Sequence, residues 1–501
     1  MWSGIIQLLL VFVIFCLTIL YFFFRHNYGY WKKRGVPYEE PTLFFGSLSF
    51  LMRKSAWDVF YDLGKKYKGD YVGLFMSWKP TLSVHSKELV KKILVKGNDG
   101  FQDRYLYAGL NNDPLGSLNL FTVKNPIWSQ MRHEISPMFT SLRLKGITEL
   151  MNINSGELVR RIKKDFIDNK EPVDLKKLFL MYTSDTVAYT VFGIQVSALK
   201  ELTSPLWLIS CNMVQWSFWR GFEFAMIFFQ PTIATFLRLQ FFSKAATNYI
   251  KKLFWDVVDE RKKNGQTNDK DFVNHLLKLK ANLKLPVEAD TQMADDLMLA
   301  QAAVFILGAI ETSSTTLCYL IHELAHHPNE QEKLYEEVRE ALQASGKDVL
   351  EYDDLLKLKY LTACIHETLR KYPPVPYLDR MCNKTYKLTD ELTLEPGTPV
   401  FVNVLAIHYN EKNYPEPTKW RPERFINSSD SDNHDFKFIP FGEGPRFCIG
   451  KRYGMMQIRS AMAQIITNYR FVSDGPYKVE SDPYSLILTP KYQTKVNIIS
   501  R

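Results

Sequence analysis

The stretch from residue 5 to residue 24 carries no charged side chain. At about 1.5 Å per residue, a helix of this length crosses a hydrocarbon core of roughly 30 Å. A cleaved signal peptide is the alternative interpretation, but no basic residue precedes the run, and the bulky residues 25–28 follow it where a small-residue cleavage site would lie. The sequence therefore predicts a retained transmembrane helix.

Basic residues flank this helix only on its C-terminal side, at Arg25 and at residues 32–34. The positive-inside rule then places the main body of the chain in the cytosol. Proline and glycine in the segment from residue 35 to residue 41 interrupt any helix, which predicts a hinge. We expect three parts, namely an anchor at 1–25, a hinge at 26–41 and one catalytic body at 42–501.

Charge and cysteine usage exclude several classes of function. The formal net charge is +9, but basic and acidic residues are interleaved, so nucleic acid is not an expected partner. A membrane surface or an acidic protein fits this pattern better. The cysteines lie far apart and form no CxxC pair, which in a cytosolic body argues against disulfides and structural zinc. They are Cys16, Cys211, Cys318, Cys364, Cys382 and Cys448.

Most of the body has the apolar spacing of helices, and short β-branched segments near 81–85 and 398–406 predict strands. One very long helix is expected from residue 291 to residue 325. The segment 205–231 is rich in aromatic residues with few charges. We interpret it as an apolar roof over a pocket that also enters the membrane interface, with ordinary core as the alternative.

The segment from Phe441 to Gly450, FGEGPRFCIG, is the most informative one for chemistry. Its glycines allow the backbone to fold closely around Cys448, and the helix-like stretch that follows directs amide groups toward the sulfur. Such donors favour the thiolate over the thiol. A buried structural cysteine is the alternative, but the surrounding pattern favours a metal-bound thiolate.

This pattern resembles the haem-binding loop of the cytochrome P450 superfamily, and the resemblance extends over nearly the whole chain. Glu367 to Arg370 match the ExxR motif of that family, and residues 422–425 match its PERF segment. Glu367 and Arg370 lie three residues apart on one helix face, and Arg424 can complete a buried charge network with them. The resemblance implies a mainly α fold with a smaller β portion behind one transmembrane helix.

The resemblance also implies haem b as the cofactor, with Cys448 as the axial ligand of its iron. Trp128 and Arg132 match the WxxxR motif of the family, Arg380 matches an arginine after the ExxR helix, and Arg446 lies within the cysteine loop. Guanidinium groups bind carboxylates bidentately. These four residues are therefore expected to bind the haem propionates.

Within the long helix, Glu311 and Thr312 match the acid and the alcohol that deliver protons in the family. Polar groups are costly to bury without a partner, although hydroxyl groups can bond back to the helix. Ala309 stands where the family usually has glycine, so an extra methyl group enters the expected oxygen groove. The implied catalytic residues are Thr312 and Glu311.

The implied activity is insertion of one oxygen atom of O2 into a lipophilic small molecule. NADPH–cytochrome P450 reductase would supply the electrons, with cytochrome b5 as a second donor, at a basic face near Lys451 and Arg452. The amino-acid sequences of residues 30–37 and 441–450 resemble those of microsomal insect enzymes that detoxify xenobiotics. The expected location is the endoplasmic reticulum membrane, on its cytosolic face. The identity of the substrate is not readable from the sequence.

Three rival functions are open at this stage. Residues 322–326 spell HExxH, the zinc-peptidase motif, but Pro328 follows at once and no third-ligand extension is present. A thiolate-haem isomerase or dehydratase would need no reductase, and the pair Glu311 and Thr312 argues against it. A haem sensor or carrier would leave the anchor, the roof and the proton-relay residues without a role.

Overall fold

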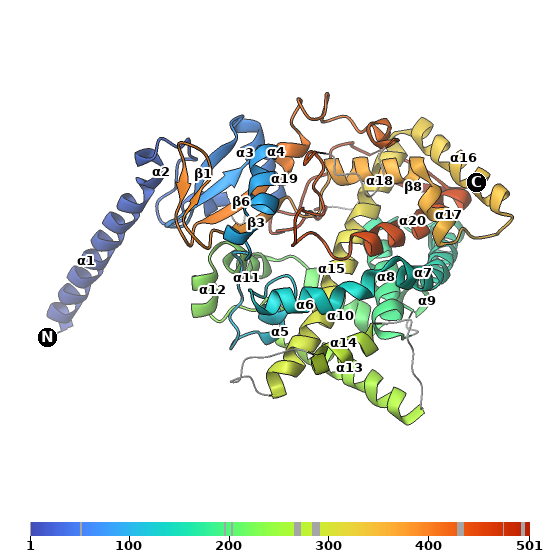
Figure 1. The fold of residues 1–501 in the computed structure, drawn as a ribbon, viewed down its shortest axis with the longest axis horizontal. Coiled ribbons are helices and arrows are strands. Elements are labelled where there is room, and N and C mark those ends of the chain that lie inside the picture. Colours follow the sequence, from blue (N-terminus) through green and yellow to red (C-terminus); the bar gives the residue numbers. More distant parts are fainter. Residues whose placement is uncertain are drawn as a thin grey trace.

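The computed structural model describes residues 2–50, 53–194, 197–201, 204–264, 272–282, 291–427, 435–473, 475–491 and 496–501. It has a large helical part and a smaller part built around a four-stranded sheet, with one long helix projecting away from both (Figure 1). The part with the four-stranded sheet lies next to the projecting helix. The expected fold class, mainly α with a smaller β portion, is confirmed.

The helices of the body differ greatly in length. The longer ones are α3 (Ala56–Lys66), α7 (Ser141–Ile162), α8 (Leu175–Val187), α10 (Pro205–Val214), α11 (Phe218–Phe229), α13 (Lys244–Asn264), α14 (Val273–Asn282), α15 (Thr291–His326), α16 (Pro328–Ser345), α18 (Lys359–Lys371) and α20 (Lys451–Asn468). The shorter ones are α4 (Lys87–Lys91), α5 (Pro114–Leu118), α6 (Ile127–Ile135), α9 (Ala198–Glu201), α12 (Pro231–Phe236), α17 (Tyr352–Lys357) and α19 (Val404–His408).

A four-stranded sheet in the order β1-β2-β6-β3 forms the centre of the smaller part. β6 pairs in parallel with β2, at Leu82↔Val400, and antiparallel with β3, at Arg380↔Val400. The remaining strands form two small two-stranded sheets. The strands are β1 (Tyr71–Met76), β2 (Lys79–Val84), β3 (Tyr377–Met381), β4 (Tyr386–Lys387), β5 (Thr393–Leu394), β6 (Pro399–Asn403), β7 (Tyr469–Val472) and β8 (Asn497–Ser500).

The strand predicted at 398–406 is shorter in the structure, because β6 ends at Asn403 and α19 begins at Val404. The Asn403 side chain accepts a hydrogen bond from the backbone N–H of Ala406 at 2.9 Å and so caps the new helix. Its amide group also donates to the Phe60 carbonyl oxygen at 2.8 Å. A capping residue inside a β-branched run therefore decides where the strand stops.

The long central helix α15 (Thr291–His326) runs through the body, close to the bounds that the sequence predicts (Figure 1). It is long and apolar enough to cross a membrane, yet 61% of its most apolar window is buried inside the protein. Its apolar surface is matched by contacts with α8, α5 and α14. α15 is therefore a core helix rather than a second membrane span.

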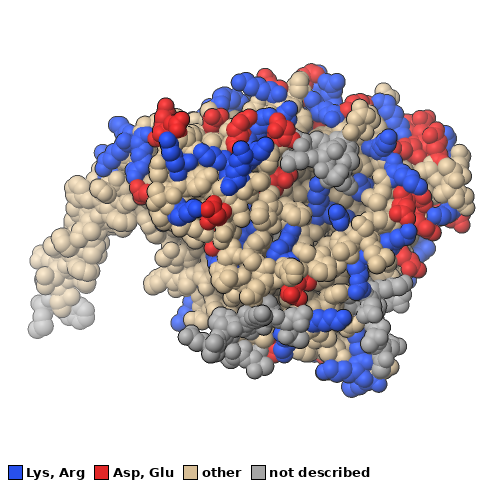
Figure 2. Space-filling view, in the orientation of Figure 1, with Lys and Arg blue, Asp and Glu red and all other residues tan. Residues whose placement is uncertain are grey.

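The N-terminal helix α1 (Trp2–Tyr28) differs, because none of its apolar window is buried by the protein. In Figure 2 it projects from the body as an arm of uncharged surface, and lysines and arginines begin where it meets the body. An exposed apolar helix of this length fits a membrane anchor. The prediction of one N-terminal transmembrane helix agrees with this geometry.

The segment predicted as a hinge is attached to the sheet at several points. In α2 (Tyr30–Lys33), Trp31 is completely buried, and its indole N–H donates to the Leu74 carbonyl oxygen at 2.9 Å. Its ring lies against Gly73, where a Cβ atom would come within 2.5 Å of the ring. The Gly73 N–H donates to the Pro37 carbonyl oxygen at 2.7 Å. The junction between anchor and body is thus fixed at Trp31.

Replacing Trp31 with Ala should loosen this junction, since it removes a fully buried side chain at a cost of about 3–5 kcal/mol. We expect faster hydrogen–deuterium exchange of the peptide segments around residues 37–39 and 73, measured by mass spectrometry. Trp219→Ala is the matched control, because Trp219 is 71% exposed. Equal exchange in both variants would show that Trp31 does not hold the junction.

Candidate active site

The loop before α20 places Cys448 at the wall of an interior cavity. Gly442 and Gly444 have φ values of +71° and +72°, which side chains rarely adopt, and a Cβ atom at Gly444 would collide with the Leu94 carbonyl oxygen. The Cys448 N–H donates to the Phe441 carbonyl oxygen at 2.8 Å. The loop therefore needs glycine at these positions to present the cysteine.

The Cys448 thiol is exposed toward the cavity and is otherwise surrounded by protein. Burial raises the pKa of this thiol, while the backbone N–H of Gly450 and the nearby Arg132 lower it. The sulfur thus lies among groups that favour an anion but in an environment that resists an unpaired charge. This combination suits a thiolate that is bound to a cation.

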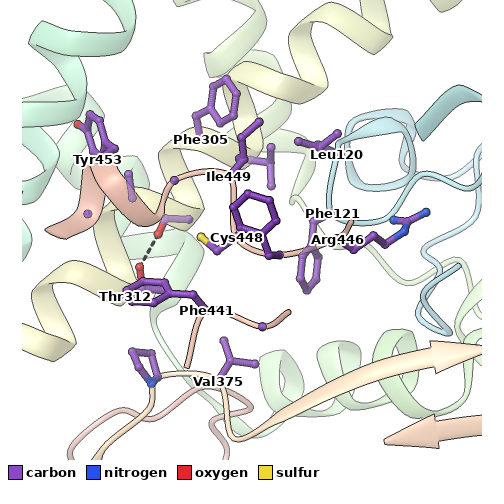
Figure 3. A pocket seen from close by; sticks show the side chains of 18 of the residues that line it. Leu120, Phe121, Phe305, Thr312, Val375, Phe441, Arg446, Cys448, Ile449 and Tyr453 are labelled. Atoms are coloured by element: carbon purple, nitrogen blue, oxygen red, sulfur yellow. Dashed lines mark hydrogen bonds between the residues drawn. The ribbon is translucent and has the colours of Figure 1, made fainter. Parts of the chain in front are cut away.

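The cavity has a volume of about 310 Å³ and lies between α15 and the cysteine loop. Figure 3 shows Cys448 and Thr312 facing the same space, with Phe441, Val375 and Phe121 around it. Its wall is mainly apolar away from one charged edge. That edge and the cysteine include all the residues predicted to bind the cofactor, namely Trp128, Arg132, Arg380, Arg446 and Cys448.

The predicted roof, 205–231, contributes no lining residue to this cavity among the residues that the structure describes. The roof helix α11 packs on the chain near Tyr484, since a Cβ atom at Gly221 would lie 2.8 Å from the Tyr484 carbonyl oxygen. The roof contacts the cavity wall from outside, because α10 packs on α15 and the Phe228 ring centroid lies 6.1 Å from that of Phe121.

Cations accumulate at the charged edge. Arg446 lies 4.2 Å above the Trp128 ring and donates to Asp103 Oδ1 at 3.1 Å. Burial and the neighbouring Arg104 lower the pKa of both Arg380 and Arg446. The cluster therefore holds more positive charge than its own carboxylates balance. Its cations are Arg104, Lys124, Arg132, Arg380 and Arg446, and its carboxylates are Asp103 and Asp379.

This excess fits an anionic group at the edge of the cavity. Arg446 Nη1 is buried and has no hydrogen-bond partner among the described residues. A buried donor without a partner is costly, and two carboxylate groups would both satisfy it and offset the charge. The donor set therefore fits the propionates of a haem whose iron faces Cys448.

The structure separates the two predicted proton-delivery residues. Thr312 lines the cavity, and its hydroxyl group donates to the Gly308 carbonyl oxygen at 2.6 Å, the dashed line in Figure 3. The Glu311 side chain is buried beside α8 instead, where its Oε1 accepts from Lys176 Nζ at 2.8 Å. Its second oxygen has no hydrogen-bond partner in the described part of the chain.

Glu367, Arg370 and Arg424 come together as one buried network. Arg370 binds Glu367 bidentately, at 2.7 Å and 2.8 Å, and both side chains are completely buried. Arg424 Nε lies 3.4 Å from Glu367 Oε1. The backbone N–H of Arg421 donates to that same oxygen at 2.9 Å. This network lies behind the site and does not line the cavity.

The HExxH residues form a structural joint at the end of α15. The Glu323 carboxylate accepts hydrogen bonds from Lys371, Tyr372 and Tyr477 at 2.7–3.1 Å. His322 Nε2 bonds to the Tyr477 carbonyl oxygen at 2.9 Å. No group of three potential metal-ligating side chains occurs within the part of the chain that the structure describes. The Glu323 carboxylate thus connects the end of α15 to the end of α18 and to the segment around Tyr477.

Comparison with known proteins decides the family. The family model described as Cytochrome P450 matches residues 36–498. The chain belongs to the cytochrome P450 family. It is therefore a cytochrome P450 monooxygenase, and membership implies a haem cofactor.

Several relatives of this cytochrome P450 come from insects. It is 32% identical to cytochrome P450 6j1 of Blattella germanica, with 98% of this chain and 95% of the relative covered. It is 31% identical to cytochrome P450 9c1 of Drosophila melanogaster, with 92% of each chain covered. The prediction of an insect-type P450 is confirmed.

Sequence reasoning missed three residues of this P450 site. Arg104 lines the cavity but lies in a loop without a motif. Asp379 pairs with Arg104 at 3.0 Å, and Lys176 pairs with Glu311 at 2.8 Å. The two partners of each ion pair are more than a hundred residues apart in the sequence, so no local pattern could have identified the pairs.

Replacing Lys176 with Met should leave Glu311 as a buried carboxylate that, among the described residues, keeps the Thr489 hydroxyl group at 3.3 Å as its one side-chain donor. We expect a loss of about 2 kcal/mol in the free energy of unfolding, read from the urea midpoint, because Lys176 is partly exposed and its loss is less costly than that of a fully buried partner. Lys177→Met is the matched control, because Lys177 is exposed on the next position of α8. Equal midpoint shifts in the two variants would contradict the assignment.

Proposed function

We propose that this cytochrome P450 uses Cys448 as the thiolate ligand of haem iron and inserts one oxygen atom of O2 into a lipophilic small molecule. The supporting observation is that Cys448 and Thr312 face one apolar cavity with a surplus of buried cations at its edge. When bound, the haem supplies the dioxygen chemistry that side chains cannot provide.

The residues of the chain have separate tasks in this proposal. Trp128, Arg132, Arg380 and Arg446, with Arg104, would bind the two propionates and so would hold the cofactor at the charged edge of the cavity. The apolar wall excludes water and orients an uncharged substrate. The Thr312 hydroxyl group holds a proton at the cavity.

Glu311 is the outer member of this proton path. Its free oxygen can accept a proton, while Lys176, which is partly exposed to solvent, keeps the carboxylate on the outer side of α15. Protons then pass from the surface to Glu311 and on to Thr312 through water.

Electrons come from NADPH through NADPH–cytochrome P450 reductase, with cytochrome b5 as a second donor. Lys451 and Arg452 begin α20 directly behind the cysteine loop, where a basic surface suits an acidic partner. The apolar helix α1 and the basic residues after it support a location on the cytosolic face of the endoplasmic reticulum membrane. Relatedness to insect enzymes supports xenobiotic detoxification as the role.

A thiolate-haem isomerase or dehydratase would need no proton path from outside. The buried pair of Glu311 and Lys176 next to Thr312 favours the monooxygenase. Turnover that requires reductase, NADPH and O2 separates the two, and turnover of an organic peroxide alone would favour the rival.

Replacing Cys448 with Ser should abolish the red-shifted Soret band of the reduced, carbon-monoxide-bound protein, because a hydroxyl group cannot donate electrons as the thiolate does. Product formation should fall to background. Cys211→Ser, at a position that does not line the cavity, should keep the band. A Cys448→Ser protein that retains both the band and turnover would refute the proposal.

Replacing Thr312 with Val keeps the shape and β-branching of the side chain but removes the hydroxyl group. We expect intact haem content, continued NADPH oxidation, more hydrogen peroxide and less product per NADPH. Loss of an indispensable proton donor costs about a hundredfold, and since water can substitute we expect a smaller, roughly tenfold loss. Product, hydrogen peroxide and NADPH oxidation are measured on one sample. An unchanged product yield per NADPH would remove Thr312 from the proton path.

A further inference from the structure

A buried carboxylate, Asp379 on β3, holds one wall loop of the cavity. One of its oxygens accepts from Arg104 Nη1 at 3.0 Å. The other accepts from the backbone N–H groups of Tyr105 at 2.6 Å and of Leu106 at 3.3 Å. Its side chain is only 3% exposed. Among the residues that the structure describes, the hydrogen bonds of the Asp379 carboxylate therefore all go to three consecutive residues of this loop.

The charges around Asp379 keep it ionised. Burial by itself raises the pKa of this carboxyl, but Arg104, Arg380 and Lys124 more than offset that effect, so its pKa lies below the ordinary value. Lys124 also binds the loop from its other side, since Nζ donates to the carbonyl oxygens of Arg104 and Leu106. Two opposite buried charges thus fix the same short piece of backbone.

Through Arg104, this loop contacts an aromatic side chain of the cavity. The Arg104 guanidinium carbon lies 4.2 Å from the centre of the Phe121 ring, and both side chains line the cavity. A guanidinium group over an aromatic face attracts it and presents a flat surface for packing. The position of Phe121 therefore depends on where Arg104 is held.

We propose that Asp379 is a positioning residue for substrate specificity, which through Arg104 fixes Phe121 and so limits the size of the molecules that fit. The inference rests on the proposed function. Without the charge of Asp379, Arg380 and Arg446 still repel Arg104, and the proposed contact with the propionates holds it from the haem side only. Arg104 then shifts away from β3 toward the propionates, and the Phe121 side of the cavity opens to bulkier molecules.

The test uses the full-length holoenzyme in lipid nanodiscs and two uncharged azoles, 4-phenylimidazole and the bulky clotrimazole. Spectral titration gives a dissociation constant for each, and the ratio of the clotrimazole value to the 4-phenylimidazole value measures size selection. We expect Asp379→Asn to lower this ratio about fivefold and Phe121→Ala to lower it by at least as much. In the double variant the two effects should not add, because they act on one wall.

Asp99→Asn is the matched control, since Asp99 is exposed, pairs with Lys384 and carries the same charge. It should leave the ratio unchanged. Arg104→Lys keeps the charge but lacks the flat guanidinium surface, and it should lower the ratio in the same direction. Haem content and the carbon-monoxide spectrum are recorded for every variant.

Additive effects of Asp379→Asn and Phe121→Ala, or a ratio that neither Asp379→Asn nor Arg104→Lys changes, would overturn the inference. If Asp379→Asn does not retain haem, the same ratio is measured for Arg104→Lys and for Arg104→Lys combined with Phe121→Ala. An unchanged ratio in Arg104→Lys, or additive effects in this double variant, would then overturn the inference. Failure of the proposed function is a separate result, namely a wild-type protein that lacks the thiolate spectrum or binds neither azole.

Discussion

The placement of the cysteine loop depends on one fully buried ion pair, between Glu367 and Arg370 on α18. Arg370 Nη1 donates to the His408 carbonyl oxygen at 3.0 Å, and His408 Nδ1 bonds back to the Arg370 carbonyl oxygen at 2.9 Å. The Ile439 N–H donates to His408 Nε2 at 3.0 Å, and the Gly442 N–H donates to the Ile439 carbonyl oxygen.

This chain of bonds leads from a buried charge pair to the loop that carries the cysteine. It needs a neutral histidine, with a proton on Nδ1 only. Burial, followed by the adjacent Arg370, lowers the pKa of His408 to about 3, so the ring stays neutral at any physiological pH. Removing either charge of the pair would leave the other without compensation in a dry interior, which is why such pairs are costly to break.

Features that depend on neighbouring residues could be predicted from the sequence, and the bounds of the longest helix are one of them. α15 begins at Thr291 and ends at His326, one residue beyond the predicted end, because apolar periodicity and the following proline define a helix from its own sequence. The residues predicted at the cavity edge meet there, since the family motifs that they match are each short and local. The sequence could not show that Glu311 faces Lys176 or that Asp379 holds Arg104, because these pairs arise only when distant elements pack together. The end of β6 was not predicted for a different reason. Asn403 caps helix α19 inside a run of residues that otherwise favours a strand.

The contact between Trp31 and Gly73 has a consequence for the evolution of this chain. A side chain at position 73 and an indole at position 31 cannot occupy the same space, so neither residue can change freely while the other stays. Related chains that have a larger residue at the position of Gly73 should have a smaller one at the position of Trp31. The two positions should therefore covary, although one lies beside the membrane anchor and the other within the first strand of the sheet.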